Sequence, residues 1–276
     1  MDSISLTHTR HARNLSVFLF ILMHASLIAV LFVPLSWGVI LLATAGYLIR
    51  MFGITAGYHR YFSHRSFKTS RTFQFILGVL GLLAMQNGPL WWSSWHRRHH
   101  KYSDTPRDPH SLRSGGFYHA HVGWIFGSAS DNPDLSNVKD LTHYSELRFL
   151  DRHKWFPLVV YALACYAIAG LSGVVWGFLV STLLALQSTM LINSLAHMWG
   201  SRPYQTKDES RNNALLAVLT LGEGWHNNHH YYMTSVRQGF RWWQIDVTYY
   251  VLRGLALMGV VWDLRLPPQH VLDAAR

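Results

Sequence analysis

Three tight clusters of histidine constrain this chain more than any other feature of its sequence. Two have the form His-x-x-His-His and the third is a pair five residues apart; the members are His59, His64, His96, His99, His100, His226, His229 and His230. Histidines spaced i, i+3 and i+4 lie on one face of a helix, so each trio presents its rings together. Imidazole is the most common metal ligand, and eight such rings exceed what one ion needs. The pattern predicts two metal ions.

The available donor atoms narrow the choice of metal. The single cysteine, Cys165, has apolar neighbours, and it excludes a disulfide framework, a cysteine-based zinc site and an iron–sulfur cluster. Zinc takes four ligands, fewer than the histidines offered here. No carboxylate lies inside a cluster, and Glu223, three residues before His226, is expected to orient a ligand. Two iron ions held mainly by imidazole fit this donor set best.

Long apolar segments predict a membrane protein. The chain is 50% hydrophobic and only 14% charged, whereas soluble domains average roughly 25% charged. A membrane-spanning helix needs about 20 residues. The expected spans are residues 15–33, 37–57, 155–169 and 174–197. The predicted fold is all-α, with four spans in a single domain, 1–276, whose remaining parts, residues 58–154 and 198–276, carry most of the clustered histidines.

The basic residues predict the orientation of these spans. Lys and Arg are absent from the turns at 34–36 and 170–173 and fill the other connecting segments. By the positive-inside rule, those segments and both termini lie in the cytosol. No cleavage-like site follows the first apolar run, so that run is expected to be retained. Topology therefore accounts for most of the net charge of +10, and nucleic acid is not an expected partner.

Two more apolar stretches, Phe73–Trp92 and Val247–Trp262, are expected to be re-entrant or interfacial helices. A crossing at Phe73–Trp92 would place the first two clusters on opposite sides of the membrane. The last span adds His197 as a ninth imidazole, four residues after Asn193 on the same helix face. The other histidines lack this spacing and are assigned no metal role, with His121 kept as a candidate supporting residue.

At these residues the chain resembles the integral-membrane fatty acyl desaturases of the stearoyl (Δ9) type. The shared motifs are TAGYHRYFSHRSF at 55–67, HRRHH at 96–100, DPHS at 108–111, HVGW at 121–124, NSLAHMWGSRPY at 193–204 and GEGWHNNHH at 222–230. They follow one another in order, with ordinary spacing, from about residue 30 to about residue 265.

The resemblance implies a bundle of four spans capped by a cytosolic di-iron domain. It implies nine histidine ligands, with Asn193 acting through a water; the histidines are His59, His64, His96, His99, His100, His197, His226, His229 and His230. The implied reaction leaves a cis double bond, most simply at Δ9, in a saturated acyl chain and reduces dioxygen to two waters. Two electrons would come from a donor, cytochrome b5-like or ferredoxin-like, with its reductase. No His-Pro-Gly-Gly motif occurs, so no fused haem domain is expected.

A C–H bond in the middle of an acyl chain has no polar group beside it for the protein to bind. The enzyme must therefore select the reacting carbons by their distance along an apolar tunnel. The resemblance places the tunnel end near Ala43 and Tyr47, where the tyrosine either shortens the tunnel or packs between helices. Trp91 and Trp95 are expected near the membrane-side entry, because tryptophan favours the level of the lipid headgroups.

The chain departs from acyl-CoA desaturases where those proteins contact the CoA headgroup. Ser94 and Trp95 replace an Arg-Asp pair, and Ser128 and Ala129 replace a basic pair. CoA phosphates need such cations. A phospholipid ester is therefore an expected substrate alongside acyl-CoA. The basic residues left to serve CoA or a carrier protein are Arg148, Arg152 and Lys154.

Two other functions share some of these features. A di-iron fatty acid hydroxylase or alkane monooxygenase has similar histidine clusters and the same oxidant, although GEGWHNNHH and NSLAHMWG favour a desaturase. A metal transporter would carry ionisable residues along its spans, and apart from His24 and Arg50 these spans have almost none. The expected location is the inner membrane of a bacterium or the endoplasmic reticulum of a eukaryote.

Overall fold

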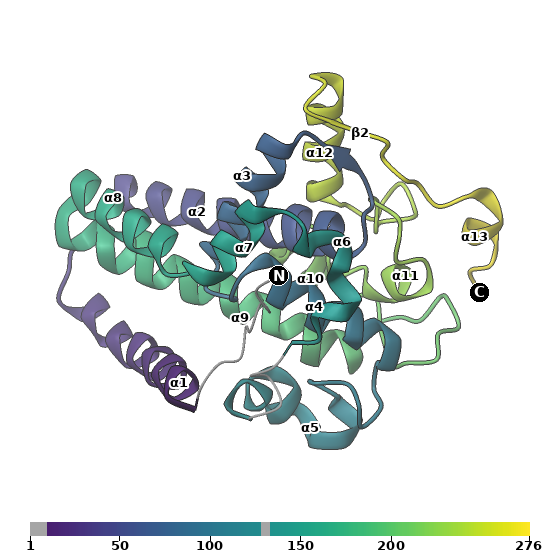
Figure 1. The fold of residues 1–276 in the computed structure, drawn as a ribbon, viewed down its shortest axis with the longest axis horizontal. Helices are drawn as coiled ribbons and strands as arrows, with labels where there is room; N and C mark the ends of the chain where they lie inside the picture. The colour runs from purple at the N-terminus through teal and green to yellow at the C-terminus, as the bar shows by residue number, and fades with distance from the viewer. Residues whose placement is uncertain (1–9, 128–132) are drawn as a thin grey trace.

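The structure is a computed structural model that describes residues 10–127 and 133–276. The described chain is helical almost throughout (Figure 1). Its two strands, β1 (Lys68–Thr69) and β2 (Val261–Trp262), pair antiparallel with Lys68 opposite Trp262. The prediction of an all-α architecture is therefore confirmed, and this short ribbon ties the C-terminal region to the segment after the first histidine pair.

The second predicted span is one continuous helical segment. Ser36 caps α2 (Trp37–Phe52) by accepting a hydrogen bond from the backbone N–H of Val39. The helix then continues as a π-helix, η2 (Gly53–Ser63). Together they form an apolar segment of 27 residues, which is long enough to cross a membrane.

The third and fourth predicted spans form a helical hairpin. The segment Phe156–His197 is 42 residues long and apolar enough to cross a membrane. It consists of α8 (Phe156–Ser172), the π-helix η6 (Gly173–Val180), α9 (Ser181–Ser194) and the 3-10 turn η7 (Leu195–His197). Gly170 breaks the helix with a φ of +56°, a left-handed conformation that glycine adopts without strain. The chain reverses there, and α8 packs along η6. The sequence prediction of a turn at 170–173 is therefore confirmed.

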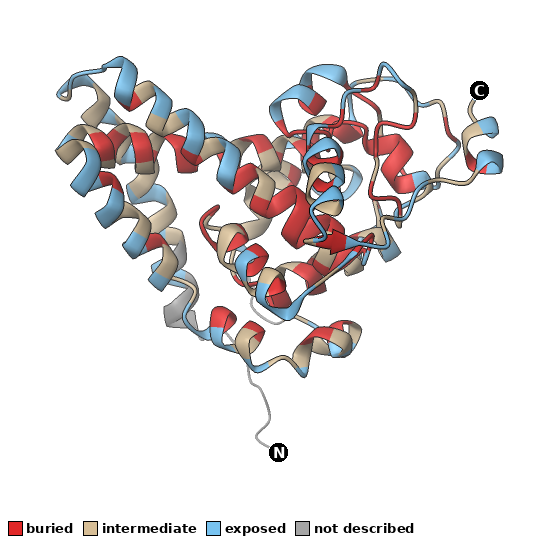
Figure 2. Cartoon of the chain, turned by 90° about the horizontal axis from the view of Figure 1, so that it is seen from above, coloured by how far each residue is buried: buried red, intermediate tan, exposed pale blue. Residues whose placement is uncertain are grey.

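The outer faces of these helices are apolar and exposed. Leu41 on α2 is 69% exposed, and Leu163 and Ile168 on α8 are 63% and 69% exposed. Figure 2 shows this contrast, with exposed residues along the outer helices and buried residues concentrated in the opposite half. A continuous apolar surface of this kind indicates contact with lipid. The first predicted span is α1 (Arg10–Ala25) followed by η1 (Ser26–Leu31), whose apolar part, Val17–Leu31, is shorter than a full span.

The stretch Phe73–Trp92 does not form one long helix. It contains α3 (Arg71–Leu82), capped by Ser70, and the start of α4 (Pro89–Tyr102). Between them Met85 and Asn87 adopt left-handed backbone conformations, with φ of +60° and +62°. A helix of 12 residues is about 18 Å long, which is too short to cross the roughly 30 Å hydrocarbon core. The same holds for α12 (Val247–Leu257), with 11 residues.

The remaining helices build a compact half around η2 and α4. They are α5 (Leu112–His121), η3 (Gly123–Phe126), η5 (Leu135–Val138), α6 (Lys139–Thr142), α7 (Ser145–Arg152), α10 (Ala214–Leu219), α11 (His226–Tyr231) and α13 (Gln269–Asp273). Its main apolar core joins residues distant in sequence, including Tyr58, Phe62, Leu77, Leu147 and Leu252, all fully buried. This core holds η2 and α4 in fixed positions; these two elements carry four of the clustered histidines, and His64 directly follows η2.

Candidate metal centre

Nine histidines from four helical segments converge into two adjoining groups. Within each group the candidate ligand atoms lie within 4.8 Å of one another. The first group, called here the five-histidine cluster, is His59, His64, His96, His100 and His229; the second, the four-histidine cluster, is His99, His197, His226 and His230. The rings of His100 and His230 lie 4.5 Å apart, so the two clusters are in contact. All nine residues were predicted from the sequence.

The π-helical geometry of η2 explains how His59 and His64 come together. In an α-helix, residues five apart point about 140° away from each other. In a π-helix the hydrogen bonds run from residue i to i+5, which brings such residues to nearly the same face. The backbone N–H of His64 donates to the carbonyl oxygen of His59 at 3.1 Å, and the two rings lie 4.8 Å apart.

Each His-x-x-His-His motif contributes to both clusters. On α4, His96 and His100 belong to the five-histidine cluster while His99 belongs to the four-histidine cluster. On α11 the assignment is reversed, because His226 and His230 join the four-histidine cluster and His229 joins the other. The i, i+4 pair of each helix therefore enters one cluster and the intervening ring crosses to the second. The two helices consequently hold both clusters at a fixed separation.

The imidazole nitrogens within each cluster meet at distances that suit a shared metal ion. Nε2 of His229 lies 2.9 Å from Nε2 of His59 and 3.0 Å from that of His100. In the second cluster, Nε2 of His197 lies 3.1 Å from that of His226. Two nitrogens bound about 2.1 Å from one metal and at right angles to each other are about 3.0 Å apart. The spacing therefore matches neighbouring ligands of a single ion.

Carboxylates hold three of the four rings in the four-histidine cluster. The Nδ1–H of His197 donates to Asp104 at 2.9 Å, and the Nδ1–H of His230 donates to Asp208 at 2.8 Å. Asp108 accepts in the same way from His99 at 3.0 Å. A proton on Nδ1 leaves the lone pair of Nε2 free to bind a metal. The Nε2 atoms of His99 and His230 lie 3.4 Å apart, each with such a lone pair. A cation bound between them would stabilise this arrangement.

These three aspartates were not predicted. They lie in loops between helices, and only Asp108 lies within a motif identified from the sequence, DPHS. Glu223 was predicted as an orienting residue, and its carboxylate contacts Nδ1 of His59. The carboxylate also accepts from the buried guanidinium of Arg60 at 3.1 Å, and Arg60 pairs in turn with Asp246 at 2.9 Å. Glu223 is therefore held by its own partners and is positioned to orient His59.

Burial keeps six of the cluster histidines neutral by lowering the pKa of their rings, namely His64, His96, His100, His226, His229 and His230. At His99 burial also lowers the pKa, but the carboxylates around it, Asp108 above all, outweigh burial and raise it. Burial is the main cause that lowers the pKa of His96 and of His229 well below the usual value, and repulsion from neighbouring histidines adds to it. Burial also lowers the pKa of His230, to about 4, although Asp208 opposes the shift. Neutral imidazole is the form that binds metal. Near neutral pH these rings are therefore ready to coordinate a cation without first losing a proton.

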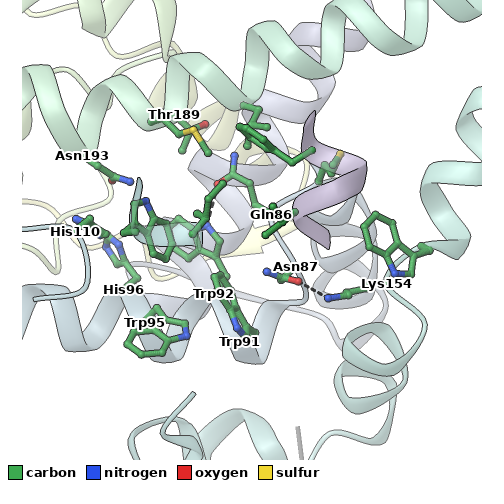
Figure 3. Close-up of a pocket in the computed structure, with 18 residues that line it drawn as sticks. Gln86, Asn87, Trp91, Trp92, Trp95, His96, His110, Lys154, Thr189 and Asn193 are labelled. Atoms are coloured by element: carbon green, nitrogen blue, oxygen red, sulfur yellow. Dashed lines mark hydrogen bonds between the residues drawn. The ribbon is translucent and has the colours of Figure 1, made fainter. Parts of the chain in front are cut away.

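Two apolar cavities adjoin the clusters and share Trp92, His96, Thr189 and Asn193 along their walls. Figure 3 shows the residues that line the larger one. The larger is lined mainly by aromatic and aliphatic side chains, including Trp91 and Trp95, as the sequence predicted for the entry region. The smaller touches members of both clusters, among them His59, His96, His99 and His226. Asn193, which was predicted to complement the ligands through a water, lines both cavities, and the smaller one is also lined by candidate ligand histidines.

Some predicted positions lie away from the two cavities and the two clusters. Ala43 and Tyr47 do not line either cavity; the phenol of Tyr47 instead hydrogen-bonds Ser188 at 3.2 Å and the carbonyl oxygen of Leu219. Met51, one turn further along the same helical segment, lines the smaller cavity. His121 contacts Ser194 and Gln187 rather than a cluster histidine, so it does not support a ligand directly.

Four other positions named from the sequence can be placed or set aside. Ser94 donates to the backbone oxygen of Asp134 at 2.9 Å and is fully buried. Ser128 and Ala129 lie outside the described residues. His110, which was assigned no role, lines the larger cavity and lies 4.4 Å from the ring of His99.

Comparison with known proteins identifies the family. The family model for fatty acid desaturases matches residues 34–263. A protein named Acyl-CoA C20 Delta5-desaturase, from Anemone leveillei, is 41% identical over 222 residues, which cover 79% of this chain and 71% of that protein. Delta-9 acyl-lipid desaturase 1 of Arabidopsis thaliana is 39% identical over 237 residues, 85% of this chain and 77% of that protein. The sn-1 stearoyl-lipid 9-desaturase of Synechocystis sp. is 37% identical over 261 residues, 93% of this chain and 81% of that protein. The histidine clusters and this similarity together show that the chain is an oxidoreductase of the fatty acid desaturase family.

Proposed function

We propose that this protein is a dioxygen-dependent desaturase that places a cis double bond at Δ9 of a saturated acyl chain, using two iron ions held by the nine clustered histidines. The observation that carries the proposal is the smaller apolar cavity, whose wall includes members of both clusters. A hydrocarbon segment in that cavity would lie directly beside both candidate metal sites. The similarity to the acyl-lipid and stearoyl-lipid 9-desaturases supports the Δ9 position, while a Δ5 enzyme is similarly close.

The proposed reaction balances with an external donor. Two hydrogens leave adjacent carbons of the acyl chain, two electrons and two protons are supplied from outside, and dioxygen becomes two waters. Bound iron would supply the dioxygen chemistry, and the protein supplies position and environment. The cavity walls hold one C–C unit of the substrate beside the clusters and exclude water. The buried carboxylates Asp104, Asp108 and Asp208 keep three rings in the orientation needed for binding.

The cavity lining predicts which residue limits chain length. Met51 lines the smaller cavity, is 1% exposed and packs against Ala185 and Leu221. Met51→Ala removes three heavy atoms, so the preferred substrate is expected to lengthen by roughly two carbons. Gas chromatography of products from mixed saturated chains measures this preference. Leu48→Ala is the matched control, because Leu48 lies on the same helix and is 43% exposed. A chain-length profile of Met51→Ala identical to that of the wild type would contradict the cavity assignment.

The setting of the enzyme is also a proposal. We place all 276 residues in one desaturase domain with four membrane spans, with both termini and both histidine clusters in the cytosol. The membrane would be the inner membrane of a bacterium or the endoplasmic reticulum of a eukaryote. The two long apolar segments and their exposed outer faces support it. The acyl carrier would be a phospholipid ester, with acyl-CoA as the alternative source, and a separate cytochrome b5-like or ferredoxin-like protein with its reductase would deliver electrons.

Expression in a host that lacks unsaturated fatty acids tests this function. Gas chromatography and mass spectrometry of the total lipid acyl chains would show the reaction type, the bond position and the chain length together. The proposal predicts cis-Δ9 monounsaturated chains that are absent from cells carrying an empty vector. Hydroxylated chains would instead identify a di-iron hydroxylase, and the proposed reaction would be wrong.

A further inference from the structure

One cationic side chain lines the larger cavity at the end away from the histidine clusters. Lys154 follows α7, and Figure 3 shows it beside Asn87, across the cavity from His96 and Asn193. Among the described residues that line this cavity, Lys154 alone carries a formal charge at neutral pH. The cavity is otherwise mostly apolar. A charged group at one end of an apolar cavity gives a bound molecule a direction.

Lys154 has hydrogen-bonding capacity to offer a ligand. Its ammonium group donates to Oδ1 of Asn87 at 2.6 Å. An ammonium has three donors, and Asn87 is the one hydrogen-bond acceptor of this group among the residues that the structure describes. The nearby carboxylate of Asp151 is already engaged, because it accepts from the backbone N–H groups of Leu90 and Trp91 at 3.0 and 3.1 Å.

The environment keeps this lysine partly desolvated. Burial lowers the pKa of Lys154 to about 8, with Asp151 opposing the shift. The amine is therefore protonated in most molecules at neutral pH. A partly desolvated cation forms a stronger hydrogen bond than a fully hydrated one. An oxygen atom brought to this end of the cavity by an acyl chain is therefore a suitable partner.

Helix α4 links the lysine to the clusters over a defined length. Asn87 lies just before this helix and His96 lies within it. The eight residue steps from Gly88 to His96 advance about 12 Å along the helix axis. An extended chain advances roughly 1.2 Å per bond, so the eight C–C bonds from a carbonyl carbon to carbon 9 cover about 10 Å. A carbonyl group at Asn87 and Lys154 would therefore place carbon 9 close to His96.

We propose that Lys154, supported by Asn87, binds the carbonyl oxygen of the acyl ester or thioester, and that the length of α4 from this anchor to His96 sets the position of the double bond. This inference rests on the proposed desaturase function and adds the residue that determines regioselectivity. Phospholipid esters and acyl-CoA thioesters share this carbonyl. The anchor therefore explains how a chain that carries Ser94 and Trp95 in place of the usual CoA-binding residues still orients its substrate.

The consequence is that the wild-type enzyme counts carbons from the carbonyl end. Palmitoyl and stearoyl substrates are then expected to give the same double-bond position. In Lys154→Gln the carbonyl end of the substrate is no longer held, and contact of the other end with Met51 becomes the remaining limit on its position. The two chain lengths are then expected to give double bonds at different carbons. The fraction of products whose double bond lies away from the wild-type carbon is expected to rise about tenfold.

The experiment expresses wild type, Lys154→Gln and Lys154→Arg with each chain length supplied, and locates the double bonds by mass spectrometry. Lys154→Arg keeps the donors and is expected to retain the wild-type position. Lys139→Gln is the matched control, because Lys139 is exposed and lies outside both cavities. Equal iron content per chain in all variants would show that each one is folded. The ratio of positional isomers does not depend on how much enzyme is made.

Reconstitution with stearoyl-CoA or with distearoyl phosphatidylglycerol in liposomes then separates the two sources of the carbonyl. The carrier tested is the one that the wild type uses. If Lys154→Gln then no longer places the double bond at one carbon, the result supports Lys154 as the group that binds the carbonyl oxygen. Unchanged positions in Lys154→Gln overturn it and leave the desaturase function intact. The proposal is also overturned if the wild type places the double bond at different carbons in palmitoyl and stearoyl substrates. An absence of any double bond in wild-type products would remove the proposed function and this inference together.

Discussion

His229→Ala is expected to reduce desaturation by more than about 100-fold, to the level of cells that carry no enzyme. The ring of His229 makes close nitrogen contacts with both His59 and His100, so its removal opens the five-histidine cluster at its centre. Loss of residues that merely support a metal ligand already costs 10–100-fold in metal affinity or activity, and loss of a proposed ligand should cost more. Acyl-chain analysis of expressing cells measures the product, and elemental analysis of the purified variant measures its iron.

The same substitution at His99 tests the other cluster. His99→Ala removes a ring of the four-histidine cluster and is expected to abolish the product as well, because the reaction needs both metal sites. His270→Ala is the control, since His270 is exposed on α13 and lies outside both clusters. Wild-type product levels in either His99→Ala or His229→Ala would contradict the assignment of these histidines as metal ligands.

Asp208→Asn is expected to weaken metal binding by 10–100-fold without removing any proposed ligand. The carboxylate of Asp208 accepts from Nδ1 of His230 at 2.8 Å and from the backbone N–H of Ser210 at 3.0 Å. The amide has nearly the same shape, but it lacks the negative charge that stabilises the bound cation through His230. The expected result is a lower affinity of the four-histidine cluster, with the five-histidine cluster little changed.

Titration of metal-free protein with Fe²⁺ under anaerobic conditions measures this effect. The wild type should bind two ions per chain, whereas Asp208→Asn should show one site of normal affinity and one that is weakened. Asp273→Asn is the control, because Asp273 is exposed and contacts only Gln269 in the described structure. Equal binding curves for Asp208→Asn and the wild type would show that the carboxylate does not affect the Fe²⁺ affinity of the four-histidine cluster.

The helical histidine motifs were predictable because their geometry is local. The spacing of His96, His99 and His100 places three rings on one helix face whatever surrounds them, and the structure confirms this. How the rings divide between two clusters was not predictable, because the division depends on how α4 and α11 meet. The closeness of His59 and His64 depends on a π-helix, for which the sequence carries no simple periodic signal.

The supporting residues were harder to predict for the same reason. Asp104, Asp108 and Asp208 reach the site from loops, and a lone aspartate in a polar loop looks like any other surface residue. The cavity lining was also hard to predict: Ala43 and Tyr47 lie outside both cavities, whereas the buried side chain of Met51, one turn beyond Tyr47, lines the smaller one. The turn at Gly170 was predicted correctly, since a cluster of glycine and serine between two apolar runs is a strong local signal.

The most direct test of the central claim is the number of irons bound by the purified protein. Protein reconstituted anaerobically in detergent or liposomes can be analysed for iron by mass spectrometry and for iron environment by Mössbauer spectroscopy. Two adjacent clusters of buried histidines predict two irons per chain, each with nitrogen-rich coordination and no sulfur ligand. A single iron per chain, or none under conditions in which the enzyme is active, would contradict the account.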